Sequence, residues 1–189
     1  MGKLLEEFHV KKNTKISDID DYLVFKDKDL LDRFRVKILE DLSDKGYVNE
    51  RVSKDLINQE IDEITYGYNL TNEERNYLFH LIDSEINGYG PITELLIDEN
   101  VTEIMVNSPK DIYIEIDGTL KKDDSVSFIN EEHIIRTIER LIEPGGKTID
   151  VNRPMIDARL SDGSRINAII PPLSLTPTIT IRKFKKDIE

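Results

Sequence analysis

The chain of 189 residues contains no cysteine and no tryptophan. The absence of cysteine excludes a disulfide framework, a thiolate metal site and a cysteine nucleophile. No stretch approaches the ~18 consecutive apolar residues of a membrane-spanning helix, and the first residues lack the apolar core of a secretory signal peptide. We therefore expect a soluble cytoplasmic protein that is long enough to form a packed core without metals or disulfides.

Acidic side chains outnumber basic ones by 38 to 26, and the net charge is −12. This excess argues against broad nucleic-acid binding. The charge is uneven, because residues 151–189 carry seven basic and four acidic side chains, a net +3, whereas residues 1–150 carry −15. A basic end on an acidic chain predicts either a contact with an anion or an ordinary solvated surface.

The first part of the chain divides into a tail without a firm period, residues 1–28, and a set of amphipathic helices in residues 29–88. Thr71 and Glu74 form a capping box that opens the last of these helices. Three helices with short links predict a small bundle. The first two predicted helices occupy residues 29–43 and about 53–65, and the third opens with Thr71 and is closed by Gly88.

From residue 89 the pattern changes to short runs that are typical of strands. Asp117-Gly118 after an alternating run predicts a hairpin, and Asn130 is positioned to cap a helix that ends at Ile142. These elements predict an α+β domain with a mostly antiparallel sheet over residues 89–186. The expected strands lie at residues 101–106, 112–116, around Val126 and Phe128, and at 155–160, 164–170 and 178–184.

The register of the hairpin around Gly163 decides which side chains share a face. A two-residue loop would mix polar and apolar side chains on both faces. A three-residue loop, with Gly163 in the left-handed conformation, pairs Arg159 with Arg165 and gathers the apolar residues on one face, so we prefer it. Arg182 in the last run alternates in the same way. Arg159, Arg165 and Arg182 should therefore converge if that run joins the same sheet.

Three arginines on one face repel each other unless an anion lies among them. Asp157 can neutralise one of them, and a phosphate group can serve the others because the guanidinium fork matches phosphate oxygens. The alternative is an exposed sheet face with an ordinary Asp–Arg pair, which contributes little stability. The sequence therefore makes a phosphate contact one of two interpretations of this face.

Complete catalytic motifs are missing from the sequence. Gly146-Lys147-Thr148 resembles the end of a P-loop, but Leu141 stands where the first glycine of that motif is required. The three histidines are far apart in different predicted elements. We therefore expect no catalytic residue and no metal ligand in this chain.

Several segments, in order, resemble the type II/IV secretion ATPases. Their order and spacing are most similar to the CpaF-like branch, which powers tight-adherence pilus assembly, and the resemblance covers about residues 70–186. The segments that carry it are GYGPITELL at 88–96, VTEIMVN at 101–107, IYIEIDG at 112–118, PMIDARLSDGSRIN at 154–167 and TIRKF at 180–184.

The resemblance implies an N-terminal helical bundle followed by a PAS-like α/β domain, with residues 187–189 beginning a linker to a C-terminal motor domain. That motor domain would carry the Walker motifs, so ATP and Mg would be cofactors of the longer protein and this portion alone should be inactive and bind neither tightly. In relatives, arginines of the N-terminal domain reach the nucleotide on the motor domain. By motif, Arg165 and Arg182 match such positions, and Arg159 is a weaker match.

The resemblance also implies partners and a location. The partners would be the chain's own motor domain, further copies in a homo-hexamer and inner-membrane platform proteins, but no nucleic acid. The location would be cytoplasmic, peripheral at the inner face of the cell membrane. The alternative function is a protein-interaction module that docks the motor to the platform without touching nucleotide. A PAS-type small-molecule sensor is a third possibility, which requires an apolar pocket.

Overall fold

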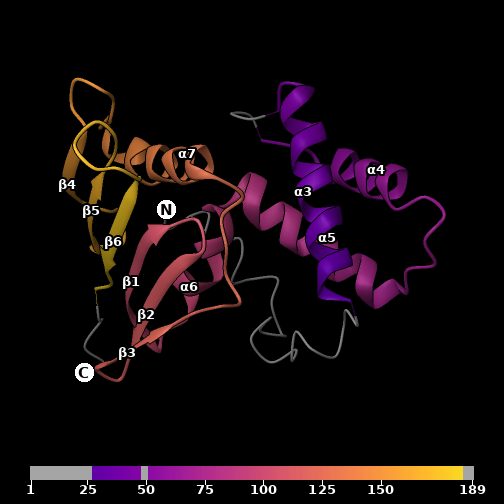
Figure 1. The fold of residues 1–189 in the computed structure, drawn as a ribbon, viewed down its shortest axis with the longest axis horizontal. Coiled ribbons are helices and arrows are strands. Elements are labelled where there is room, and N and C mark those ends of the chain that lie inside the picture. The colour runs from indigo at the N-terminus through magenta and orange to yellow at the C-terminus, as the bar shows by residue number, and fades with distance from the viewer. Residues whose placement is uncertain (1–26, 48–50, 185–189) are drawn as a thin grey trace. The chain divides into compact units, whose positions relative to one another are not determined.

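The computed structural model describes residues 27–47 and 51–184, which form two compact units that divide between Gly90 and Pro91 (Figure 1). The tail predicted for residues 1–28 falls, up to residue 26, outside the described residues, and so does the predicted linker at 187–189. Within the described residues, no helix combines the length and apolar character needed to cross a membrane.

The helical unit follows the predicted amphipathic pattern closely. Each helix begins at a side-chain cap. Asp27 accepts a hydrogen bond from Leu30 N, and Ser53 accepts one from Leu56 N. Thr71 forms the predicted capping box with Glu74. Capping satisfies backbone N–H groups that have no partner inside the helix. In the described part of this unit the helices are α3 (Lys28–Asp44), α4 (Lys54–Ile64) and α5 (Asn72–Asn87). Their shared core includes Phe34, Ile38, Leu42, Ile57, Ile61, Leu78 and Ile82.

A buried ion pair crosses the core of the helical unit. Arg35 on α3 is 5% exposed and Glu85 on α5 is 3% exposed. The Arg35 guanidinium donates two hydrogen bonds to the Glu85 carboxylate, one of them from Nη2 to Oε2 at 3.0 Å. Burial raises the pKa of Glu85, and the charge of Arg35 opposes this shift. Each charge therefore lowers the cost of burying the other in the core.

The second unit is an α+β domain, as predicted. In residues 91–184 six strands form one sheet in the order β3-β2-β1-β6-β5-β4, with every pairing antiparallel. The strands are β1 (Val101–Ser108), β2 (Asp111–Ile116), β3 (Thr119–Lys122), β4 (Met155–Arg159), β5 (Arg165–Ile169) and β6 (Thr178–Arg182). The helices are α6 (Thr93–Ile97), which contacts β1, and α7 (Glu131–Ile142), which Asn130 caps. Short 3₁₀ turns precede α6 at Gly90–Ile92 and follow α7 at Glu143–Gly145.

One predicted strand is wrong. Strand β3 follows directly after Asp117 and Gly118, whose φ angles of 51° and 73° form the predicted tight turn, and it does not lie around Val126 and Phe128. All four residues of β3 are exposed, so the strand lacks the apolar alternation that reveals a half-buried strand. Phe128 is instead a buried anchor whose N–H donates to Pro109 O at 2.8 Å.

The C-terminal end of β6 is fastened to α6 and β1 through Lys183. Its backbone N donates to Thr102 O at 2.9 Å, and its Nζ donates to Leu95 O at 3.2 Å and to Asp98 O. The ammonium therefore lies at the C-terminal end of α6, where carbonyl groups are left without helical partners. Burial lowers the pKa of Lys183, and Asp98 opposes this shift. We infer a structural role for this cation.

A second contact fastens the same end of β6 to the β4–β5 turn. Phe184 N donates to Ser164 Oγ at 3.2 Å. The Phe184 ring lies against Gly163, where an added Cβ atom would be 3.4 Å from the ring. Gly163 has a φ of 88°, so this position favours glycine for its backbone conformation as well. The turn and the end of β6 thus support each other.

Replacing Glu85 with glutamine should strongly destabilise the helical unit. The substitution removes the carboxylate charge that is hydrogen-bonded to the buried Arg35 guanidinium and leaves the exposed Asp32, 3.8 Å away, as a weaker counter-charge. The loss should be up to about 3–5 kcal/mol in free energy of unfolding. Urea titration of the full chain, followed by the amide NMR signals of α3 to α5, measures this loss. Asp62→Asn, which weakens the exposed pair with Arg75, is the matched control and should cost less than about 1 kcal/mol. Equal losses in the two variants would contradict the assigned role of the buried pair.

Replacing Lys183 with methionine should loosen the end of β6. The aliphatic part of the side chain is retained, but two backbone carbonyls lose a charged donor, which costs about 1–2 kcal/mol after allowance for partial exposure. Urea titration followed by amide signals of β5 and β6 measures the change, and amide exchange at Phe184 should accelerate. Lys121→Met, on the exposed strand β3, should change stability by no more than about 0.5 kcal/mol. Unchanged exchange at Phe184 would show that Lys183 does not fasten the strand.

Candidate functional site

Three arginines lie side by side across neighbouring strands. Arg159 on β4 is directly opposite Arg165 on β5, and Arg165 is directly opposite Arg182 on β6. The turn between β4 and β5 has the predicted three-residue loop, closed by a hydrogen bond from Leu160 N to Ser164 O at 2.7 Å. All three arginine side chains are exposed on the same face of the sheet. We call Arg159, Arg165 and Arg182 the arginine row.

Like charges that face each other across strands are destabilising, because their Cβ atoms are only about 4.5–5.5 Å apart. Asp157, two residues before Arg159 on β4, partly relieves this repulsion. It accepts from Arg165 Nε at 3.0 Å and from Arg165 Nη2 at 2.6 Å. These hydrogen bonds hold the pKa of Asp157 below its usual range and raise that of Arg165. The Asp–Arg pair expected from the sequence is therefore present, and it is bidentate.

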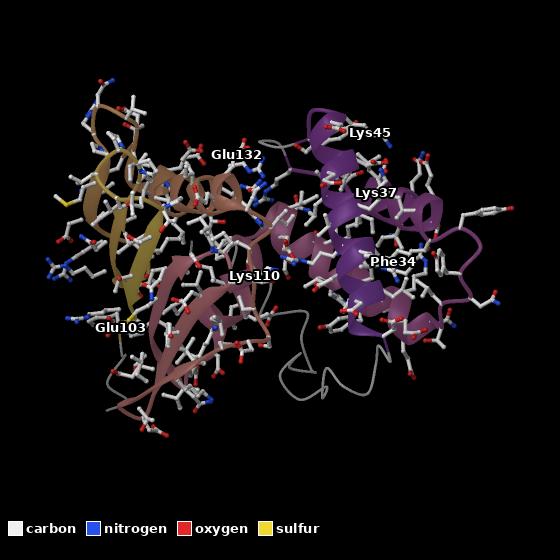
Figure 2. All side chains as sticks on the ribbon, viewed as in Figure 1. Phe34, Lys37, Lys45, Glu103, Lys110 and Glu132 are labelled. Atoms are coloured by element: carbon white, nitrogen blue, oxygen red, sulfur yellow. The ribbon has the colours of Figure 1, made fainter. Side chains whose placement is uncertain are left out.

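A second carboxylate lies at the other end of the arginine row. Glu103 on β1 (labelled in Figure 2) is directly opposite Arg182. Arg182 Nε donates to Glu103 Oε1 at 3.2 Å, and the Glu103 side chain is 14% exposed whereas that of Arg182 is 74% exposed. Glu115 on β2 is in turn opposite Glu103 and accepts from Thr102 Oγ1 at 2.6 Å. The row thus continues as two glutamates on the next two strands.

Arg159 differs from its two neighbours in its surroundings. Among the described residues, no carboxylate forms an ion pair with Arg159, whereas Arg165 and Arg182 each have one. In the part of the chain that the structure describes, three guanidiniums are therefore matched by two directly bonded carboxylates, which leaves a net positive charge on the row. Such a surface can bind phosphate oxygens through the guanidinium forks. The guanidiniums themselves cannot act as bases, because a guanidinium stays protonated.

The sequence correctly predicted the shared face of the arginines, but contact with a nucleotide remains a prediction. Sequence reasoning missed Glu103, since its closeness to Arg182 depends on β1 pairing with β6, which are 79 residues apart at this contact. The P-loop-like Gly146 has a local structural explanation. It has a φ of 65° and ends the 3₁₀ turn after α7, where the backbone is left-handed.

The segment that carries the arginine row is similar to known proteins. The family model described as type II/IV secretion system protein matches residues 85–188. A Mycobacterium tuberculosis (strain H37Rv) protein named for conjugal transfer is 24% identical over 104 residues, which is 52% of this chain and 29% of that protein. An uncharacterized protein of Methanocaldococcus jannaschii is 29% identical over 121 residues, which is 61% of this chain and 21% of that protein.

Among solved structures, the VirB11 ATPase from the Brucella suis type IV secretion system, in complex with sulphate, is 28% identical with a TM-score of 0.46. The match covers 52% of this chain and 31% of that one. The chain spans less than a third of the length of each of these three proteins. The family model, in contrast, covers more than half of the chain, from the end of α5 through the arginine row to β6. The chain therefore belongs to the type II/IV secretion system protein family.

Proposed function

We propose that this chain is the nucleotide-sensing N-terminal portion of a secretion ATPase, in which the arginine row reads the phosphates of a nucleotide held by a separate motor domain. One observation carries the proposal. Arg159, Arg165 and Arg182 are exposed in a single cross-strand row and, within residues 27–47 and 51–184, outnumber the carboxylates bonded to them. The sequence holds no complete P-loop of its own, so another segment must cradle the nucleotide.

The coupling mechanism follows from electrostatics. A triphosphate presents its terminal phosphate to the arginines, and hydrolysis changes the number and position of the negative charges. The ligand then has a different affinity for closed and open arrangements of the two domains, which is the condition for coupling chemistry to movement. The arginines act as sensors and clamps that stabilise developing charge, as arginine fingers do in other phosphoryl-transfer enzymes.

The remaining details of the proposal concern the longer protein. ATP and Mg are its proposed cofactors, a homo-hexamer its assembly, and inner-membrane platform proteins its partners at the cytoplasmic face of the membrane. We further propose membership of the CpaF-like branch and a role in protein export or pilus assembly, supported by the order of the five motif segments between residues 88 and 184.

In a longer protein that carries the motor domain, the double substitution Arg165→Ala with Arg182→Ala should lower kcat/KM for ATP. The loss should be at least about 100-fold, because charge-assisted contacts to the transferring phosphate disappear. Phosphate release under steady-state conditions measures this change, and amide NMR spectra of residues 1–189 with the same substitutions check that the fold is retained.

The matched control removes the same amount of charge elsewhere. Lys110→Ala with Lys121→Ala takes two exposed cations from the sheet unit without touching the arginine row, so turnover should stay within about twofold of the unmodified protein. Unchanged ATP turnover in the arginine double variant would overturn the sensor assignment. It would favour the alternative, a docking module without nucleotide contact.

A further inference from the structure

Glu103 is an unexpected neighbour for a phosphate-binding surface. Its negative charge opposes the binding of an anion nearby, yet it lies directly opposite Arg182 and is bonded to it at 3.2 Å. Its side chain is only 14% exposed, so the carboxylate is held by its surroundings. The charge of Glu103 lowers the positive potential of the arginine row, so its effect on Arg182 must come from the orientation that it gives to the guanidinium.

The two paired arginines are held in different ways. Arg165 gives Nε and Nη2 to Asp157, so one whole edge of its guanidinium is occupied. Arg182 donates only Nε to Glu103, so among the described residues the opposite edge, formed by Nη1 and Nη2, is available for a ligand. That edge is one of the two that can bind a phosphate through parallel hydrogen bonds.

We propose that Glu103 is a positioning residue that holds Arg182 by Nε and presents its Nη1–Nη2 edge to a phosphate group. This proposal rests on the proposed function of the arginine row and adds the residue that orders its last member. The backbone supports the arrangement, because Glu103 and Arg182 are paired residues of β1 and β6, and Lys183 N bonds Thr102 O immediately beside them. An arginine that is already ordered loses less rotamer freedom on binding.

Glu115 provides a matched control for this idea. It is directly opposite Glu103 on β2, on the same face, and carries the same charge. It accepts a hydrogen bond from Thr102, and no ion pair joins it to an arginine among the described residues. If Glu103 acted through its charge alone, neutralising either glutamate would strengthen anion binding. If Glu103 positions Arg182, glutamine at this position replaces a charge-assisted hydrogen bond to Nε with the weaker bond of an amide oxygen, so the arginine is held less firmly and binding should weaken. The two explanations therefore predict changes of opposite sign.

The experiment titrates the ¹⁵N-labelled chain of residues 1–189 with inorganic tripolyphosphate and follows the arginine Nε–Hε signals. We expect binding with a Kd on the order of millimolar, weakened about fivefold by Glu103→Gln. Glu115→Gln should leave the affinity unchanged or improve it by no more than about twofold. Before any ligand is added, the Arg182 Nε–Hε signal should move in Glu103→Gln and stay in place in Glu115→Gln.

A further variant, Arg182→Ala, separates the two levels of the proposal. If Arg182→Ala weakens binding but Glu103→Gln strengthens it as much as Glu115→Gln does, Glu103 is not a positioning residue and the arginine row keeps its function. If Arg182→Ala has no effect, or if no arginine signal responds to millimolar tripolyphosphate, the phosphate contact fails and this inference fails with it. Should Glu103→Gln not fold, Glu103→Asp keeps the charge on a shorter side chain and should weaken binding for geometric reasons alone.

Discussion

Cross-strand register is the constraint on which the arginine row depends. The alternation that buries Ile166 on β5 and Ile181 on β6 places Arg165 and Arg182 on the opposite, exposed face. A slip of one residue in either strand would move an arginine into the core and an isoleucine into water. The apolar core of the sheet therefore holds three mutually repelling cations in line, and their repulsion is too small to change that register.

The three arginines of the row differ in how many hydrogen bonds they donate to carboxylates. Asp157 occupies one edge of Arg165, Glu103 holds Arg182 by a single nitrogen, and Arg159 has no carboxylate bonded to it among the described residues. The result is a surface with positive charge but with limited freedom at two of its three cations. This combination suits a sensor, because a preordered cation responds to where a negative charge lies as well as to whether it is present.

Features that depend on residues close together in the sequence were predicted correctly. The cap at Asn130, the turn at Gly163 and the alternation of the last strands are read within a few residues, so the helix, the hairpin and the shared arginine face could all be expected. Contacts between segments that are far apart in the sequence could not be predicted in this way. Glu103 meets Arg182 across 79 residues, and the buried partner of Arg35 is 50 residues away. Periodicity shows which face of an element is buried but does not name the element that covers it.

The fastening of β6 has a mechanical consequence. Arg182 is followed at once by Lys183 and Phe184, which tie the strand end to α6, β1 and the β4–β5 turn. A force applied to the chain after Phe184 would therefore act on the sheet within two residues of Arg182. Because hydrogen bonds hold both residues that follow Arg182, such a force would load these contacts before it could move the arginine.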